Sequence, residues 1–324
     1  MITKIFTLLI IVLFLVALTQ VIRIFQLTGK IKGYDINETT DYDNNLNGIL
    51  SIIFSILFFA FCVYQYLEFK KFILPESASF HGIFIDKMNN LSLIAITVVF
   101  VIMNALIFYL SYKYRSKKET KASFVTHNNK LELIWTILPG IVLTVYILYG
   151  LNVWSQVMHP SEEDPMLIEI YGQQFSWTAR YAGEDNLLGE SHYTLVNNKN
   201  VLGVDSKDVN SNDDIIVREL HIPIDEPIML KFRSQDALHS AYLPHFRVQM
   251  NCVPGLETSF MFIPIKTTKQ MRIELKDESF DYVLLCNKIC GSSHFNMQMK
   301  VIVETREEYN EWIGQQPKFK EINL

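Results

Sequence analysis

The sequence predicts transmembrane α-helices in the N-terminal part of the chain, followed by an all-β Greek-key sandwich. Two observations lead to this fold class. Apolar residues make up 49% of the 324 residues, and long apolar runs account for most of the first 154. Residues 155–324 instead contain short segments of alternating apolar and polar residues, separated by turn residues, which is typical of a β-sandwich.

Four apolar runs are each long enough to cross a bilayer, which takes about 20 residues. They cover residues 5–26, 48–67, 91–112 and 131–151. The first run could instead be a signal peptide, but no small-x-small cleavage site follows it, so we keep it as a span. The predicted domains are an N-terminal region with two transmembrane helices in residues 1–70, a helical hairpin in 71–154 and a soluble domain in 155–324.

The loop after the third apolar run determines the predicted orientation. It contains the strongest basic cluster in the chain, formed by Lys113, Arg115, Lys117, Lys118, Lys121 and Lys130. Loops rich in Lys and Arg stay in the cytoplasm. The fourth run then carries the chain across the membrane, so residues 155–324 are predicted to be extracytoplasmic.

The soluble domain shows strand patterns and one helix signal. Strands are predicted at residues 166–171, 228–232, 259–263, 271–275, 280–285 and 299–303. Residues 182–214 are rich in Asn, Asp and Gly and are predicted to form a polar insertion or loop. Thr305 and Glu308 have the spacing of a capping box, which predicts a short helix near the C-terminus.

The soluble domain is acidic, with 25 Asp and Glu residues against 16 Lys and Arg residues. This balance disfavours nucleic acid as a partner and favours a basic protein. An ordinary solvated acidic surface explains the charge equally well.

Four side chains that bind soft metals occur within one stretch of twelve residues. They are Cys286, Cys290, His294 and Met297. Thiolate, thioether and imidazole are the ligands that copper prefers. Predicted strands flank this stretch, which places the ligands on one loop between two strands, as in copper-binding β-sandwiches. His239 is the best candidate for a further ligand from elsewhere in the chain.

A structural zinc site and a disulfide are the alternative interpretations of this loop. Zinc sites usually contain Cys pairs separated by two residues and do not need Met. The other two cysteines, Cys62 and Cys252, have no partner at ligand spacing and are interpreted as structural. The chain has no C-x2-C-H motif, so it carries no attached c-type haem of its own.

The copper loop and the His239 segment together resemble cytochrome c oxidase subunit II, which has a cupredoxin-like sandwich and a dinuclear copper (CuA) centre. The resemblance extends from about residue 74 to the end of the chain. Further matching motifs are residues 131–139, residues 172–177, His239-Ser240 with Pro244, and Val253-Pro254-Gly255. The two N-terminal spans lie outside the two-helix pattern that is usual in this family.

The resemblance assigns roles to individual residues. It implies that the copper pair is held by the side chains of His239, Cys286, Cys290, His294 and Met297 and by the backbone carbonyl of Lys288. It places Glu132 at the entrance of a proton path into subunit I, although an acidic residue at a membrane edge can simply snorkel. It places Phe175 and Trp177 where electrons enter. The family has Trp at the position of Phe175, and Phe is harder to oxidise.

Three positions depart from the family pattern near the copper loop. Lys288 stands where the family usually has a Glu that also reaches a magnesium ion at the boundary with subunit I, while Gln249 and Asn251 replace Lys and Asp. An ammonium group has no lone pair for a hard cation. We therefore expect no magnesium ligand from the side chain of Lys288.

The resemblance implies an oxidoreductase subunit in a bacterial inner membrane, with the copper domain on the periplasmic side. Electrons are expected from a c-type cytochrome or from a haem c domain of a neighbouring respiratory complex. They are expected to pass to haem in subunit I, where oxygen is reduced and protons are pumped. The expected partners are subunit I, other oxidase subunits and the lipid bilayer, and nucleic acid is not among them.

Two rival functions remain open at the level of sequence. A quinol oxidase subunit II would be a copper-free structural subunit and would lack the Cys and His ligands. A membrane-anchored copper-binding protein could share the copper loop, but Glu132 and residues 133–139 would not be expected in it.

Overall fold

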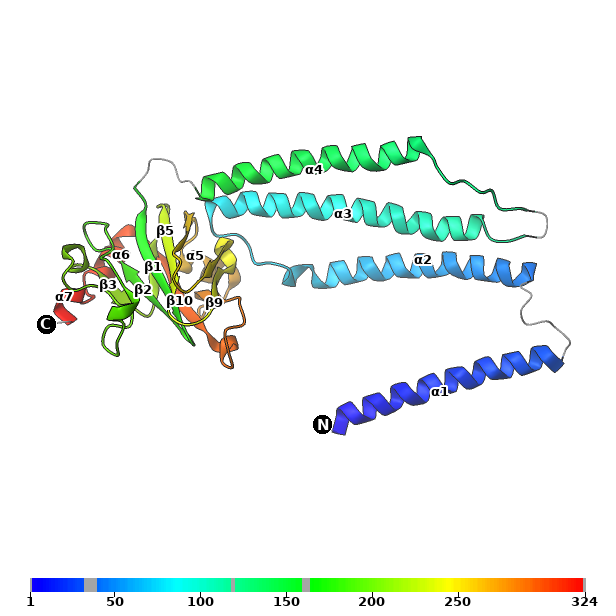
Figure 1. The fold of residues 1–324 in the computed structure, drawn as a ribbon, viewed down its shortest axis with the longest axis horizontal. Helices are drawn as coiled ribbons and strands as arrows, with labels where there is room; N and C mark the ends of the chain where they lie inside the picture. The colour runs from blue at the N-terminus through cyan, green and yellow to red at the C-terminus, as the bar shows by residue number, and fades with distance from the viewer. Residues whose placement is uncertain (1, 32–39, 118–119, 159–163, 323–324) are drawn as a thin grey trace. The chain divides into compact units, whose positions relative to one another are not determined.

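The computed structural model describes residues 2–31, 40–117, 120–158 and 164–322. The chain forms two compact units. The first unit contains Met1–Glu68 and Ile96–His127, and the second contains Phe69–Ala95 and Asn128–Leu324. Figure 1 labels the helices and several of the strands.

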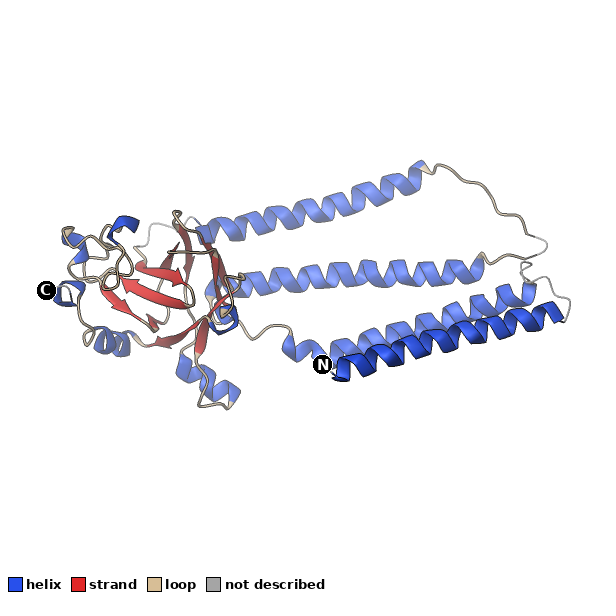
Figure 2. Cartoon of the chain, turned by 60° about the horizontal axis from the view of Figure 1, so that its bottom comes forward, coloured by secondary structure: helices blue, strands red, loops and turns tan. Residues whose placement is uncertain are grey.

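Four helices in the described residues are long and apolar enough to cross a membrane. They are α1 (Ile2–Ile31), α2 (Asp41–Phe69), α3 (Phe80–Lys113) and α4 (Asn129–Met158), drawn in blue in Figure 2. Each helix contains one predicted span and continues beyond it into polar residues. The helical part of the predicted fold class is confirmed.

Within the first unit, α2 packs against the second half of α3 through aromatic rings. The ring centroids of Phe54 and Phe108 lie 5.5 Å apart, and those of Phe58 and Phe100 lie 5.9 Å apart. Beyond the end of α3, Nε of Arg115 donates a hydrogen bond of 2.6 Å to the side chain of Asn45. The two segments are therefore joined by apolar contacts along the helices and by a polar contact at one end.

The β domain, residues 166–322 of the second unit, contains two sheets of five strands each. The strand orders are β3-β2-β1-β5-β8 and β4-β10-β9-β6-β7. The strands are β1 (Met166–Gln173), β2 (Ser176–Tyr181), β3 (Ile215–Val217), β4 (Leu220–Pro223), β5 (Ile228–Ser234), β6 (His239–Leu243), β7 (Val248–Cys252), β8 (Thr258–Phe262), β9 (Tyr282–Cys286) and β10 (Gln298–Glu304). Strands β1 and β5 pair in parallel, as do β4 and β10, whereas the other pairs are antiparallel. The predicted sandwich is confirmed.

Alternating side chains of the strands fill the space between the sheets. In β5 every second residue is buried, namely Ile228, Leu230, Phe232 and Ser234. In β10 the buried positions are Met299, Val301 and Val303. Each large apolar side chain that is removed from water stabilises the fold by about 1.5–3 kcal/mol. These two strands lie where the sequence predicted strands, at residues 228–232 and 299–303.

Residues 271–275, predicted as a strand, belong instead to helix α5 (Thr268–Leu275). Thr267 caps this helix by accepting a hydrogen bond from the backbone of Gln270, whose side chain bonds back to Thr267. The alternation of Met271, Ile273 and Leu275 was therefore misleading. Only Met271 is buried, while Ile273 and Leu275 are exposed, so the apolar residues do not share one sheet face.

The end of the chain forms two short helices, α6 (Arg306–Ile313) and α7 (Phe319–Ile322). The predicted capping box is present, because Thr305 accepts a hydrogen bond from the backbone of Glu308 and the Glu308 side chain accepts one from the backbone of Thr305. The described part of the chain also contains five 3-10 turns, at Lys70–Phe72 (η1), Tyr193–Leu195 (η2), Val209–Ser211 (η3), Pro244–Phe246 (η4) and His294–Asn296 (η5).

The polar segment 182–214, all of which is described, forms a loop that contains only 3-10 turns and isolated bridges, as predicted. Leu202 and Val204 of this loop are buried in a small second core with Tyr171 and Phe319. This small core fixes the loop to the sheet and to α7.

A buried cluster of charges also fixes this loop. Nε of Arg180 donates to Glu169 at 2.7 Å, and its Nη1 donates to Asp214 at 2.9 Å and to the carbonyl oxygen of Gly189 at 2.9 Å. Burial favours a higher pKa for Glu169, but Arg180 and Arg233 outweigh it, so the pKa of Glu169 lies below its ordinary value. Burial raises the pKa of Asp214 to about 6 despite the nearby Arg180.

The β domain is also tied to the start of α3 within the second unit. Arg247, in the turn after β6, forms two hydrogen bonds with Asp86 of α3, at 2.7 and 2.9 Å. It also donates to the carbonyl oxygen of Pro75 at 2.6 Å. The turn that follows the strand of His239 is therefore attached to the membrane hairpin.

Candidate copper centre

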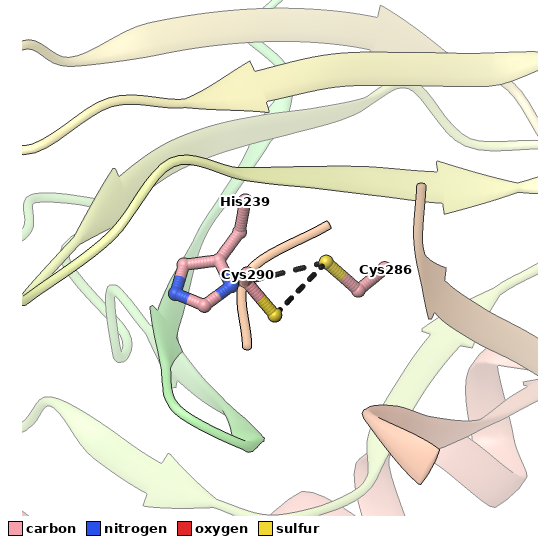
Figure 3. A group of neighbouring side chains, drawn as sticks. All are labelled: His239, Cys286 and Cys290. Atoms are coloured by element: carbon pink, nitrogen blue, oxygen red, sulfur yellow. Dashed lines mark hydrogen bonds between the residues drawn. The ribbon is translucent and has the colours of Figure 1, made fainter. Parts of the chain in front are cut away.

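Three of the predicted ligands lie together where β6 begins and β9 ends. These strands pair antiparallel with Ala241 opposite Cys286. His239 lies two residues before Ala241, so its side chain is on the same face as that of Cys286. Nδ1 of His239 lies 3.8 Å from Sγ of Cys286 (Figure 3). The Sγ atoms of Cys286 and Cys290 lie 3.9 Å apart. The three ligand atoms all lie within 4.8 Å of one another, close enough to share a metal.

The loop between β9 and β10 brings the remaining predicted groups to the same two thiols. Nδ1 of His294 lies 3.7 Å, and Sδ of Met297 3.8 Å, from Sγ of Cys290. The carbonyl oxygen of Lys288 lies 3.2 Å from Sγ of Cys286. Four of the six groups assigned by resemblance therefore converge on the other two, the sulfur atoms of Cys286 and Cys290.

Backbone hydrogen bonds close the loop around this site. The N–H of Cys286 donates to the carbonyl of Met297 at 3.1 Å, and the N–H of Asn287 donates to the carbonyl of Ser240 at 2.8 Å. The N–H of Met297 donates to the carbonyl of His294 at 3.2 Å. These bonds hold the ligand positions independently of any metal.

The thiols of Cys286 and Cys290 are both free. Burial, together with the neighbouring Cys286, raises the pKa of Cys290 to about 11. A metal ion binds the thiolate, so it must displace the proton and then stabilise the buried negative charge. Met297 is buried with its sulfur beside Cys290. A thioether in this position fits a soft metal such as copper better than zinc.

Asp236, which the sequence interpretation did not single out, fixes the orientation of His239. Its Oδ1 accepts a hydrogen bond of 2.9 Å from Nε2 of His239, which leaves Nδ1 facing the thiols. Partial burial favours a higher pKa for Asp236, but hydrogen bonds from His239, Gln174 and Ala237 lower it below the ordinary value. Carboxylates commonly orient metal-binding histidines in this way. The only sequence signal is the three-residue spacing between Asp and His.

The two aromatic residues proposed for electron transfer lie next to the ligands. Trp177 is buried, with its ring centroid 5.9 Å from that of His239. The ring of Phe175 packs on Gly291 so closely that a Cβ there would lie 2.7 Å from it. Gly172 leaves room for the rings of Trp177 and His239, since a Cβ at this residue would lie 3.0 Å from Trp177 and 3.1 Å from His239.

Glu132 does not belong to this site. It lies in the first turn of α4, and Met158 ends the same helix. At 1.5 Å per residue, these positions are separated by about 40 Å of helix. Its predicted role concerns protons and is independent of the copper ligands.

The two cysteines interpreted as structural are free thiols in the structure. Cys62 lies in α2. Cys252 is fully buried on β7, opposite His239 in the strand register. Burial raises the pKa of Cys252 to about 12, which keeps it protonated.

Comparison with known proteins identifies the family. Residues 67–153 match the family model of the cytochrome c oxidase subunit II transmembrane domain, and residues 166–305 match that of its periplasmic domain. A relative from Bradyrhizobium diazoefficiens, an alternative cytochrome c oxidase subunit 2, is 33% identical over 239 residues, which cover 73% of this chain and 81% of the relative. The chain belongs to the cytochrome c oxidase subunit II family.

Two further proteins from the comparisons have a lower sequence identity to this chain. The cytochrome c oxidase subunit 2 of Synechocystis is 24% identical over 264 residues, or 75% of each chain. The crystal structure of the periplasmic domain of a Bradyrhizobium japonicum cytochrome oxidase subunit II is 20% identical, with a TM-score of 0.31 over 46% of this chain and 91% of that one. The first part of the chain, before residue 67, lies outside both family models.

Family membership settles the broad function. The protein is a subunit II of a haem–copper oxidase, with apolar helices that fit a membrane protein and a β-sandwich of the periplasmic-domain family. The family implies a copper centre, and His239, Cys286 and Cys290 form a cluster that can hold a metal ion.

Proposed function

We propose that this subunit II accepts electrons from a c-type cytochrome at a dinuclear copper centre and passes them to haem in subunit I. There, oxygen is reduced to water and protons are pumped. The observation that carries the proposal is the convergence of two histidines, a thioether and a carbonyl on a pair of thiols whose sulfur atoms lie 3.9 Å apart.

The proposed ligands are the side chains of His239, Cys286, Cys290, His294 and Met297 and the backbone carbonyl of Lys288. When bound by these residues, with the thiolates of Cys286 and Cys290 among the ligands, the copper would supply transfer of one electron at a time. The chain contributes a loop closed by backbone hydrogen bonds and a histidine held by Asp236. Because these ligands are held in place, they move little when the charge of the centre changes, which favours rapid electron transfer.

Purification of the chain from its own membrane tests this function. We expect two copper ions per chain and a haem-bearing subunit that co-purifies. A haem subunit with no copper bound to this chain would favour the copper-free quinol oxidase subunit, which the converging ligands argue against. Copper without a haem subunit would favour a membrane-anchored copper-binding protein, which membership of the oxidase family argues against.

The proposed location is the bacterial inner membrane, with the β domain on the periplasmic side. The basic loop that begins at Lys113 supports a cytoplasmic position for the α3–α4 connection. Glu132, in the first turn of α4, then lies near the cytoplasmic surface, where a proton path into subunit I would begin. Residues 1–70 with α1 and α2 form a region additional to the hairpin of residues 71–154 and the copper domain of residues 155–324.

The periplasmic location has a consequence for assembly. An oxidising compartment favours a disulfide between Cys286 and Cys290, whose sulfur atoms are only 3.9 Å apart. Copper requires both thiols reduced. We therefore infer that assembly depends on a factor that reduces the two thiols and delivers copper.

The electron donor is proposed to reach the site near Phe175 and Trp177. Both aromatic rings lie against the ligand segments, with Phe175 on Gly291 and Trp177 beside His239. Phe175 lacks the indole N–H of the tryptophan that is usual in the family. The aromatic contact with the copper loop is retained, and the chemistry of the surface presented to the donor differs.

We expect the oxidation of an added basic cytochrome c to slow as ionic strength rises. The acidic excess of residues 155–324 attracts a basic donor. Added salt weakens this attraction, because charges separated by more than the Debye length, about 10 Å at 0.1 M ionic strength, are largely screened from each other. Oxygen consumption at increasing salt measures the effect, with an uncharged reductant as the control. Turnover that does not change with salt would contradict steering and favour a haem c domain fixed in a neighbouring complex.

We expect Lys288→Gln to leave the magnesium content of the purified oxidase unchanged. The carbonyl of Lys288 faces the copper site, and its ammonium group has no lone pair for magnesium. Metal analysis of the two proteins measures this, and Lys300→Gln on β10 is a matched control. A structure of the complex in which a side chain of this subunit binds magnesium would contradict the prediction.

A further inference from the structure

The turn between β1 and β2 connects the two segments that carry the copper ligands. Gln174 lies in this turn, and its backbone N–H donates a hydrogen bond of 2.8 Å to Oδ2 of Asp236. The other oxygen of Asp236 accepts the Nε2–H of His239 at 2.9 Å. The side-chain amide of Gln174 donates to the carbonyl oxygen of Cys290. One residue outside the proposed ligand set therefore joins His239 to Cys290.

Close packing supports these hydrogen bonds. Gly291, next to Cys290, has φ of 150°, and a Cβ at this residue would lie 2.9 Å from the amide nitrogen of Gln174. On the other side, the N–H of Gln235 donates to the carbonyl of Gly172 at 3.0 Å. The β1–β2 turn is thus packed against the copper loop and bonded to the turn that precedes β6.

We propose that Gln174 is a positioning residue that braces the copper centre. Through Asp236 it fixes the ring of His239, and through its side-chain amide it fixes the backbone of Cys290. Two ligands from segments distant in sequence are then held at one separation by hydrogen bonds that do not need a metal. The inference rests on the proposed function, because it assumes that His239 and Cys290 bind copper.

Copper release from the purified oxidase to a chelator tests the brace. Gln174→Ala removes the side-chain bond and keeps the backbone bond to Asp236, so we expect release to accelerate about fivefold, the effect of one hydrogen bond. Gln174→Glu has nearly the same shape but lacks the amide donor, and we expect a similar acceleration. Gln173→Ala is the control, because it removes a glutamine side chain from the neighbouring position. The oxidase with this substitution should release copper at the wild-type rate.

A double-mutant cycle with Gln174→Ala and Asp236→Ala tests whether the two residues act together in holding the copper ligands. Removal of a carboxylate that orients a metal-binding histidine typically lowers metal affinity about 10-fold to 100-fold. If Gln174 and Asp236 act as one unit, Gln174→Ala will have a smaller effect in the Asp236→Ala background than in the wild type. Equal effects in both backgrounds would overturn the idea of a single unit.

A second readout does not involve copper. In the copper-free oxidase, we expect the backbone amide of Gln174 to exchange with deuterium at least about tenfold faster in Asp236→Ala than in the wild type. This result supports the brace even if the chain held no copper pair, so it separates this inference from the proposed function. A two-copper centre that releases copper at the wild-type rate in Gln174→Ala and Gln174→Glu would overturn the inference and leave the function intact.

Discussion

Replacing Cys290 by serine is expected to leave at most one copper ion per chain and to abolish the oxidation of cytochrome c. The Sγ atom of Cys290 lies within 4 Å of three other proposed ligand groups, those of Cys286, His294 and Met297. A serine hydroxyl is a hard oxygen donor that stays protonated, so it cannot replace a thiolate that bridges two soft ions. Copper analysis and oxygen consumption of the purified oxidase measure the two effects.

Cys252→Ala is the matched control for this experiment. It also removes a buried thiol, from a residue paired with His239 in the sheet, but Cys252 lies outside the proposed ligand set. This variant should keep both copper ions and wild-type oxygen consumption. A Cys290→Ser oxidase that retained two copper ions would contradict the ligand assignment.

Arg180→Met is expected to lower the free energy of unfolding of the β domain by about 3 kcal/mol. Arg180, Glu169 and Asp214 are all at most 2% exposed. Replacing Arg180 by an uncharged residue therefore removes a positive charge that pairs with two buried carboxylates. Removal of one partner from a buried ion pair typically costs about 3–5 kcal/mol. The lower value applies because Arg233 continues to pair with Glu169. Urea unfolding followed by tryptophan fluorescence measures the change.

Lys199→Met provides the comparison for that measurement. Lys199 is an exposed cation in the same loop, and substitutions at such positions usually change stability by less than about 0.5 kcal/mol. An Arg180→Met protein with the wild-type unfolding midpoint would show that the buried cluster does not stabilise the loop on the sheet.

The four apolar runs were sufficient to predict the four long helices, and the strand alternation was sufficient to predict the sandwich as a fold class. In the helices the pattern reflects an apolar surface along the whole segment, and in the strands it reflects one buried face. The structure has apolar long helices and strands with alternating buried side chains. The pattern failed at residues 271–275, because three apolar residues in alternation also fit a short helix with one buried side chain. The capping pair of Thr267 and Gln270 was the signal that could have distinguished the two.

The ligand loop was predictable because its side chains are rare and lie close together in the sequence. Gln174 and Asp236 were not predictable as a brace, since their connection depends on how the β1–β2 turn packs on segments about 60 and 116 residues away. The same holds for Glu169 and Arg180, which face each other only in the register of β1 and β2. Sequence patterns indicate which faces are buried, whereas register and turn packing require the structure.

Electron paramagnetic resonance of the purified, oxidised oxidase is the most direct test of the proposed copper centre. The account predicts the hyperfine pattern of one unpaired electron shared equally by two copper nuclei, because each of two neighbouring thiols has a histidine nitrogen within 4 Å and the two sets of ligands would hold a copper pair. A pattern from an electron confined to a single copper nucleus, or no copper signal from this subunit, would contradict it.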